Sequence, residues 1–202
     1  KGFKDQHGKE WTADVFVVNG DAASFRHEVF QRKKYTEKRL DNMKWTLAPF
    51  TMYLGVKGKI DQLEHHNYFL GNNFREYAEK VFKNSITFEK PYYYVNVISK
   101  FNKESAPEGH ENLMVLIPVA PNLKDTDETR EKYYDLAMNR LENVTGQKIR
   151  EHVVYKKVYA HREFSKDYNA YKGNAYGLGN TLMQTAFLKP SILNKRVQNL
   201  FY

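Results

Sequence analysis

The sequence predicts an α+β fold, in which helices pack as a layer against a mixed or antiparallel sheet. Short apolar runs of strand length are mixed with segments of helical periodicity, and no internal repeat is present. The 202 residues are 41% hydrophobic and 15% aromatic, which is enough to bury a substantial core. No apolar run approaches the roughly 18 residues of a membrane span. We therefore expect a soluble globular piece.

Strands are predicted where apolar residues run unbroken or alternate with polar ones, because side chains of a strand point alternately to its two faces. The apolar run Val15–Val18 is typical of a strand buried on both faces. Pro49 places the start of a later strand near an edge or bulge. In chain order the predicted strands cover 11–19, 47–56, 65–70, 92–98, 113–119, 149–159 and 197–202.

Helices are predicted where a capping residue precedes apolar residues at helical spacing. Asp21 and Asp125 are cap candidates, and Asn73 with Glu76 resembles a capping box. Gly146 is typical of a helix end. In chain order the predicted helices cover 22–30, part of 35–45, 74–82, 126–145 and 162–168.

The charge balance permits an anionic partner without identifying one. The 32 Lys and Arg residues exceed the 24 Asp and Glu residues, which gives a formal net charge of +8. No RNP-like, helix-turn-helix or zinc-finger pattern accompanies this charge, so no nucleic-acid partner is expected. The sequence has no Cys, which excludes disulfides, thiolate zinc sites and cysteine nucleophiles.

Basic residues concentrate beside an apolar helix pattern between residues 25 and 44. This stretch has two interpretations: a solvated helix face, or a surface that rests on anionic lipid head groups. The second interpretation makes a set of apolar and basic side chains face the membrane, namely Phe25, Phe30, Arg32, Lys33 and Lys34.

Motifs of the common catalytic classes do not occur in the sequence. His65 and His66 are adjacent, so in a strand they point to opposite faces and do not chelate one metal together. The glycine-rich stretch 173–179 lacks the spacing of a dinucleotide fingerprint and the Lys of a P-loop. Its glycines suit close approach to other backbone or to a flat ligand. The residues alone predict an α+β piece with a pocket lined by aromatic and aliphatic side chains.

Both ends of the sequence have the pattern of an internal segment. The sequence opens without Met, and nothing follows the last predicted strand, 197–202. Because domains rarely stop on an apolar strand, we expect a piece of a longer protein.

Three stretches, in this order and spacing, resemble the bacterial carotenoid desaturase (phytoene dehydrogenase) family of flavoproteins. The first is Ala13–Asp21, which is similar to the family's strand ending in Asn-Ala-Asp. The second runs from Phe50–Val56 through His65–Phe69 to Ala106–Leu113, which contains Ala-Pro-Glu-Gly. The third combines the Ala-Tyr-Gly-Leu segment within 173–178 with Gln-Thr-Ala-Phe at 184–187, Lys-Pro at 189–190 and Asn-Leu-Phe-Tyr at 199–202.

This resemblance implies a division of the chain into three parts. Residues 1–21 resemble a strand hairpin of a Rossmann-like FAD-binding domain, 22–172 the substrate-binding domain, and 173–202 a return segment and strand of the FAD-binding domain. The family's main FAD-binding motifs lie before and after the corresponding segment. We therefore expect the chain by itself to be inactive and free of FAD.

The implied reaction is FAD-dependent dehydrogenation of a linear polyprene, such as phytoene or its thirty-carbon analogue. A hydrocarbon has no polar group for the protein to bind, so the protein must supply an apolar tunnel. The flavin accepts the electrons. The implied location is cytoplasmic, peripheral to the inner face of the cell membrane. A carotenoid isomerase or oxygenase of the same fold is an alternative, and so is a non-enzymatic lipid-binding module.

The resemblance also suggests individual site residues. Asn19, Asp21 and Gly177 are candidates for cofactor contact, and His66 and Glu108 are candidates for a catalytic acid or base. No metal site is expected. The candidates for the wall of the substrate tunnel are Phe50, Tyr53, Tyr68, Tyr94, Leu116 and Tyr176.

Overall fold

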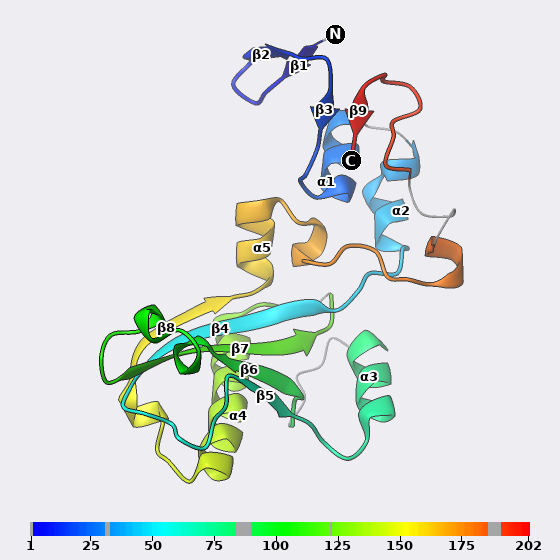
Figure 1. Cartoon of the computed structure of the whole chain (residues 1–202). Coiled ribbons are helices and arrows are strands. Elements are labelled where there is room, and N and C mark those ends of the chain that lie inside the picture. The colour runs from blue at the N-terminus through cyan, green and yellow to red at the C-terminus, as the bar shows by residue number, and fades with distance from the viewer. Residues whose placement is uncertain (1, 31–32, 84–89, 122, 186–190) are drawn as a thin grey trace. The chain divides into compact units, whose positions relative to one another are not determined.

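The computed structural model describes the chain except residues 1, 31–32, 84–89, 122 and 186–190. The described chain divides into two compact units, one of residues 1–44 and 178–202 and the other of residues 45–177. Both units combine helices with strands, so the predicted α+β class is confirmed (Figure 1).

The first unit brings the two ends of the chain together. Strand β3 (Phe16–Val17) pairs in parallel with β9 (Leu200–Phe201), and β1 (Gly2–Lys4) forms an antiparallel hairpin with β2 (Glu10–Thr12). The helical elements of this unit are α1 (Ala22–Phe30), η1 (Lys33–Tyr35), α2 (Glu37–Asp41) and η6 (Leu182–Gln184).

Aromatic rings hold α1 to the strands of this unit. The Phe25 ring lies 6.0 Å from Phe3 and 5.9 Å from Tyr202, measured between ring centroids. The guanidinium of Arg26 lies 4.0 Å from the Tyr202 ring, and its Nη2 donates to the Ser191 carbonyl over 2.9 Å. Residues 22–44 therefore pack with the chain ends, and the compact unit extends past the predicted boundary at residue 21.

The second unit is built on a five-stranded antiparallel sheet with strand order β5-β6-β7-β4-β8. Its strands are β4 (Ala48–Lys57), β5 (His66–Phe69), β6 (Tyr93–Val97), β7 (His110–Val119) and β8 (Val153–Tyr159). The α-helices are α3 (Phe74–Lys83), α4 (Asp127–Thr145) and α5 (His161–Tyr168). Short 3₁₀ turns are η2 (Ile98–Lys100), η3 (Lys103–Ser105), η4 (Arg150–His152) and η5 (Tyr171–Gly173).

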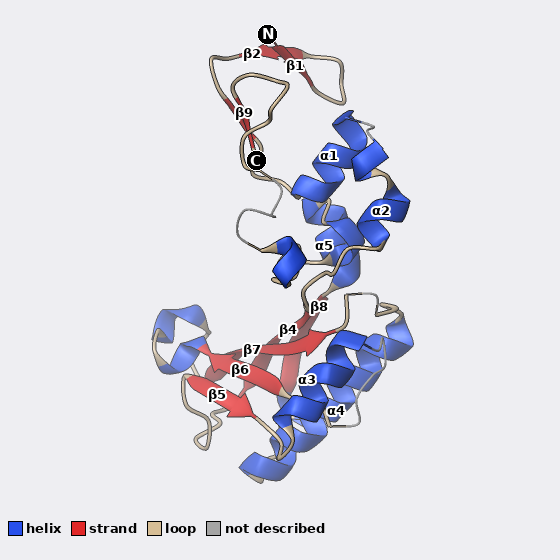
Figure 2. Ribbon diagram, turned by 90° about the vertical axis from the view of Figure 1, so that its right-hand side faces the viewer, coloured by secondary structure: helices blue, strands red, loops and turns tan. Residues whose placement is uncertain are grey.

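One face of this sheet packs against α4 and forms the core (Figure 2). Strand β7 alternates between half-buried and buried residues, and Leu113, Val115 and Ile117 are at most 1% exposed. Opposite residues of an antiparallel pair share a face, so Phe50, paired with Ile117, joins the same core. The Phe50 ring lies 4.9 Å from the ring of Tyr133 on α4.

Some predicted strands are shorter in the structure. The segment 11–19 splits into β2 and β3, and Val17 is 71% exposed, so the prediction of a strand buried on both faces is wrong. Phe16 is half-buried on one face of this two-residue strand, whereas the face that carries Val17 is exposed in the described chain. The predicted strand 149–159 begins at Val153, because Arg150–His152 forms a 3₁₀ turn.

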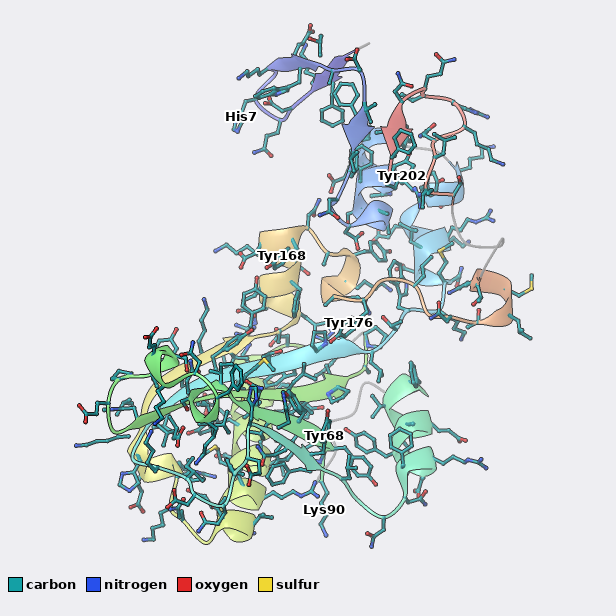
Figure 3. All side chains as sticks on the ribbon, viewed as in Figure 1. His7, Tyr68, Lys90, Tyr168, Tyr176 and Tyr202 are labelled. Carbon is teal, nitrogen blue, oxygen red and sulfur yellow. The ribbon has the colours of Figure 1, made fainter. Side chains whose placement is uncertain are left out.

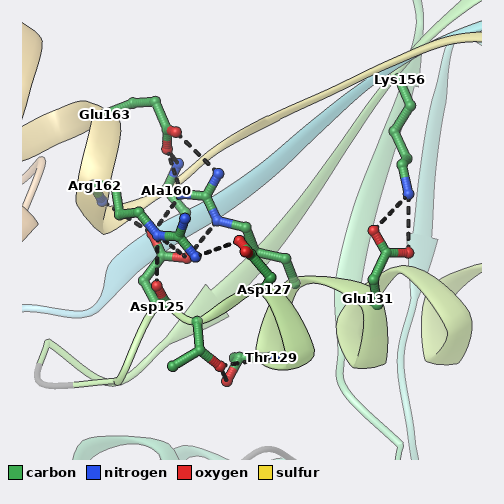
Figure 4. A network of polar contacts seen from close by, with 10 residues as sticks. Asp125, Asp127, Thr129, Glu131, Lys156, Ala160, Arg162 and Glu163 are labelled. Atoms are coloured by element: carbon green, nitrogen blue, oxygen red, sulfur yellow. Dashed lines mark hydrogen bonds and ion pairs between the residues drawn. The ribbon is translucent and has the colours of Figure 1, made fainter.

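A network of ion pairs joins the start of α4 to the start of α5 (Figure 4). Arg130 donates two hydrogen bonds to the Asp125 carboxylate, at 2.6 and 2.7 Å, and two to Glu163, at 2.9 and 2.8 Å. The side chains of Arg130 and Asp125 are only 13% and 5% exposed. This geometry is bidentate on both sides, which is the strongest form of such pairing.

We predict that Arg130→Met lowers the free energy of unfolding by about 3 kcal/mol, because it leaves two carboxylates close together and poorly solvated. Urea unfolding followed by circular dichroism measures the change. The matched control is Lys80→Met, which removes an exposed pair with Glu76 and costs less than about 1 kcal/mol. Equal losses in the two variants would contradict the role given to Arg130.

The same network predicts how stability depends on pH. Burial raises the pKa of Asp125 and of Glu163, but hydrogen bonds from Arg130 and from backbone N–H groups outweigh burial and lower each pKa. Their stabilisation is therefore complete above the unfolded pKa near 4 and is lost as the pH falls through the lower folded pKa. In urea unfolding from pH 6 to about pH 2, Asp125→Asn should lose stability less steeply than the unmodified chain. Parallel curves would refute this assignment.

Candidate functional site

Two neighbouring rows of side chains lie on the face of the sheet opposite α4. Each row contains one residue from each of the five strands. Strand register fixes both rows, because directly paired residues point to the same side. We call this surface the aromatic face. In the order β8-β4-β7-β6-β5, one row is Tyr159, Thr51, Leu116, Tyr94 and Tyr68, and the next is Lys157, Tyr53, Met114, Asn96 and His66.

The aromatic face is more open than the core face. Tyr53 is 39% exposed, and Tyr68, labelled in Figure 3 on the edge strand β5, is 71% exposed. Met114 and Leu116 are half-buried, whereas their β7 neighbours on the core face are fully buried. Exposed aromatic side chains grouped on one face are typical of ligand or partner sites in soluble proteins.

Stacked rings and hydrogen bonds order one side of this face. The Tyr94 ring lies 5.2 Å from Tyr68 and 5.9 Å from His66. The Tyr94 hydroxyl lies 2.5 Å from His66 Nδ1, and Asn96 Nδ2 donates to that hydroxyl over 3.0 Å. Asn96 Nδ2 also donates to the His65 carbonyl over 3.3 Å. We call His66, Tyr94 and Asn96 the polar trio.

Four of the six residues predicted for the substrate wall lie on the aromatic face: Tyr53, Tyr68, Tyr94 and Leu116. Phe50 does not, because its side chain is 0% exposed and packs in the core against α4, so we remove it from the proposed wall. Sequence reasoning missed Asn96 and Met114. The two-residue period of a strand contained the signal, since it puts Asn96 on the same face as Tyr94 and Met114 on the same face as Leu116.

Tyr176 lies outside the sheet, in the segment after η5, and is 61% exposed (Figure 3). This segment is shaped by Asn174, whose buried Oδ1 accepts hydrogen bonds from the N–H groups of Tyr176 and Gly177 at 2.8 and 2.6 Å. The Gly177 carbonyl accepts from Thr46 N over 3.1 Å. A Cβ on Gly173 would lie 2.5 Å from His161 Cα, so this glycine permits the close backbone approach predicted for the stretch.

The two acid or base candidates lie in different places. His66 is part of the polar trio on the aromatic face. Glu108 lies in the exposed turn before β7, where its carbonyl pairs with His110 Nδ1 over 2.9 Å. Of the two, His66 is the one that the structure places among the proposed wall residues.

Asn19 and Asp21 follow the carboxyl end of β3, directly before α1. The Asp21 carboxylate accepts a hydrogen bond from Ser24 N over 2.8 Å and so caps the helix. In open α/β sheets, nucleotides bind outside the carboxyl ends of parallel strands. Asn19 and Asp21 follow a strand of the parallel pair β3–β9, which is two residues long on each side.

Two of the predicted membrane-facing residues, Phe25 and Phe30, lie in α1 and are half-buried. Their rings pack against Tyr202, at 5.9 and 6.5 Å between ring centroids. Lys33 is exposed. Arg32 and the Lys34 side chain lie outside what the structure describes.

Among the described residues, no helix is long and apolar enough to cross a membrane. The same part of the chain contains no group of three or more His, Asp or Glu side chains placed to hold a metal ion. A cavity of about 450 Å³ lies away from the aromatic face, lined by Val56–Ile60, Gln147–Ile149 and His152. Two basic side chains that line this cavity form ion pairs: Lys59 with Glu111 at 3.8 Å and Lys148 with Glu151 at 3.4 Å.

Comparison with curated proteins identifies relatives over almost the whole chain. A carotenoid 3,4-desaturase of Haloarcula japonica is 35% identical over 97% of the chain. A zeta-carotene-forming phytoene desaturase of Myxococcus xanthus is 26% identical over 100% of the chain. A 4,4'-diaponeurosporene oxygenase of Staphylococcus haemolyticus is 25% identical over 100% of the chain. The chain spans 40 to 41% of the length of these relatives.

A solved structure of an oxidoreductase from Methanosarcina mazei has a similar fold. Its TM-score is 0.55 at 12% identity, and the match covers 100% of this chain and 42% of the other. No protein-family model matches the chain. The curated desaturases nevertheless match 94 to 100% of the chain, and by sequence the chain belongs to the carotenoid desaturase family, spanning about two fifths of the length of these relatives.

Proposed function

We propose that this chain is part of an FAD-dependent desaturase that dehydrogenates a linear polyprene in carotenoid biosynthesis, and that the aromatic face forms one wall of the substrate tunnel. The observation that carries the proposal is the clustering of Tyr53, Tyr68, Tyr94 and Leu116 on one open sheet face. The names of the curated relatives support the reaction class.

The chemistry of a polyprene explains why such a face is useful. A hydrocarbon forms no hydrogen bonds, so its affinity comes from apolar area removed from water, at about 25 cal/mol per Å². Aromatic side chains supply large contact areas with few rotatable bonds. Strand pairing fixes the spacing of the rows, and this rigidity keeps a long substrate in one register near the reacting centre.

Bound FAD would accept the electrons removed from the polyprene. The residues of this chain that would contact it are Asn19 and Asp21, which follow the parallel strand β3. Gly177 is a weaker choice, since its turn is explained by its φ of 74° and its hydrogen bonds within the second unit. The aromatic face binds and orients the substrate and excludes water from it.

The proposal includes a peripheral location at the inner face of the cell membrane, where a polyprene dissolves. Phe25 and Phe30 are half-buried against Tyr202, so the exposed basic residues near α1 and α2, such as Lys33 and Lys38, would make the contact with anionic lipids. We expect the chain by itself to lack activity, because the proposal assigns most of the FAD contacts to other parts of the protein.

An oxygenase acting on a related polyprene is the second candidate. It is favoured by the match to the relative named 4,4'-diaponeurosporene oxygenase, which covers 100% of the chain. An aromatic face serves either reaction, since both need the polyprene held in register. Analysis of products distinguishes them: a desaturase adds double bonds, whereas an oxygenase adds oxygen.

We predict that the complete protein containing this chain, expressed in a host that accumulates colourless phytoene, produces pigments with new long-wavelength absorption. Leu116→Lys should reduce the pigment yield at least tenfold, because the tunnel would enclose an unpaired charge. The matched control is Val144→Lys, at a 62% exposed position on α4, which should leave the yield unchanged.

If the folded, flavin-loaded Leu116→Lys variant gave an unchanged pigment yield, the aromatic face would not be part of the substrate site. Absence of pigment from the unmodified protein, shown to be folded and flavin-loaded, would argue against phytoene as substrate. The same assay with the thirty-carbon analogue would then decide whether the protein is a desaturase.

A further inference from the structure

His161 is a buried histidine whose imidazole makes no hydrogen bond. The residue is 8% exposed, and neither Nδ1 nor Nε2 has a hydrogen-bond partner in the part of the chain that the structure describes. A neutral imidazole carries one N–H group, and a protonated imidazole carries two. Each buried N–H group without an acceptor costs free energy, so protonation of His161 is less favourable here than it is in water.

His161 lies where α5 meets η5. It is the first residue of α5, and the helix dipole disfavours a positive charge at that end of a helix. The backbone of η5 packs directly on His161, since a Cβ on Gly173 would lie 2.6 Å from the His161 carbonyl oxygen and 2.7 Å from its Cβ. The contact between α5 and η5 therefore includes a side chain that tolerates a positive charge poorly.

The charged groups that act on His161 do not offset the cost of burying its charge. Asp125 raises the pKa of His161, as does the backbone of Ala120 and Pro121, and Arg130 lowers it. Burial is the largest effect and holds the pKa of His161 below its ordinary value. The Asp125 carboxylate is already engaged, because it accepts two hydrogen bonds from Arg130 (Figure 4).

The titratable side chains of η5 are engaged with one another and with Trp45. The ring of Tyr171 lies 4.9 Å from the ring of Trp45, measured between ring centroids. Lys172 Nζ lies 5.8 Å from the centroid of the Tyr171 ring. The part of η5 that packs on His161 is Gly173, which brings no side chain to solvate or to pair a protonated imidazole.

We propose that His161 is an acid-sensitive switch, which holds α5 and η5 together while its imidazole is neutral and lets them separate when the imidazole is protonated. The segment that follows η5 contains Asn174 and Tyr176, so the switch controls how firmly the start of this segment is held. The inference concerns a conformational property of the second unit and goes beyond the proposed function, on which it does not depend.

The pH range of the opening follows from the two states of the contact. In the open state His161 is hydrated and has an ordinary pKa near 6.5, whereas in the closed state its pKa is lower. The closed state therefore has its full stability above about pH 6.5 and loses stability as the pH falls towards the lower pKa. The carboxylates of Asp125 and Glu163 titrate at lower pH, because their own pKa values are lowered, so they do not contribute in this range.

The test is hydrogen exchange of the complete protein at pH 7.5 and pH 5.5, followed by mass spectrometry, with each rate divided by the intrinsic rate at that pH. The Ala170 N–H donates to the Phe164 carbonyl over 3.1 Å, and the Gly173 N–H donates to the Ala170 carbonyl over 3.0 Å, so these amides report the separation of η5 from α5. Their opening should increase between about threefold and tenfold at pH 5.5, because one pH unit below 6.5 permits at most about a tenfold change. Amides of β7 should show no change.

Two variants remove the titrating group and one controls for the loss of a histidine. His161→Gln and His161→Phe carry side chains that do not titrate between pH 5 and 8, so the increase in opening at pH 5.5 should disappear in both. The phenyl ring of the second variant needs no hydrogen bond, which keeps the test valid if the buried amide of the first destabilises the unit. His152→Gln, at an exposed position in η4, is the matched control and should keep the full increase.

Equal opening of the unmodified protein at the two pH values would overturn the inference. An increase that persists in both His161 variants would do so as well, because another group would then be responsible. A second readout is the titration of the His161 ring, followed by NMR of the complete protein with labelled histidine. A midpoint clearly below pH 6.5 is expected, and a midpoint near 6.5 would contradict the switch.

Discussion

The pairing of β7 with β4 is the constraint on which the second unit depends. Residues 113, 115 and 117 point to α4, and the residues between them point to the aromatic face. A slip of one residue would exchange the two sets and expose the core. At the start of β7 the buried Glu111 bonds to Ser99 Oγ and pairs with Lys100 at 3.3 Å, which adds a specific contact that opposes such a slip.

The two faces of the sheet thereby serve different ends. The face towards α4 stabilises the fold, because its apolar side chains are almost completely buried. The Arg130 network also holds the start of α4 against α5. The aromatic face contributes less to the core of the described chain and remains available to a ligand. Helix α5 packs on this face at Tyr159, whereas Tyr53 and Tyr68 are exposed. A rigid sheet with such an exposed aromatic surface suits a substrate that is held mainly by apolar contact.

The sequence predicted the elements of the sheet better than the direction of each side chain. Both 92–98 and 113–119 were predicted as strands and are strands in the structure, and their pairing places Tyr94 opposite Leu116 on one face. In 47–56, apolar residues occur at both odd and even positions, so the sequence does not indicate which face is buried. Only the pairing with β7 shows that Phe50 belongs to the core and Tyr53 to the aromatic face. Likewise the apolar run at Val15–Val18 does not reveal that the face carrying Val15 and Val17 is exposed in the described chain.

The most direct test of the aromatic face as a substrate surface is the rate of thiol labelling. The chain has no Cys, so Met114→Cys introduces a single thiol on the face, and Val144→Cys introduces one on the exposed side of α4. In the complete protein, with any Cys outside this chain replaced, saturating polyprene should slow labelling at position 114 at least tenfold and leave position 144 unchanged. Equal rates at position 114 with and without polyprene would contradict the account.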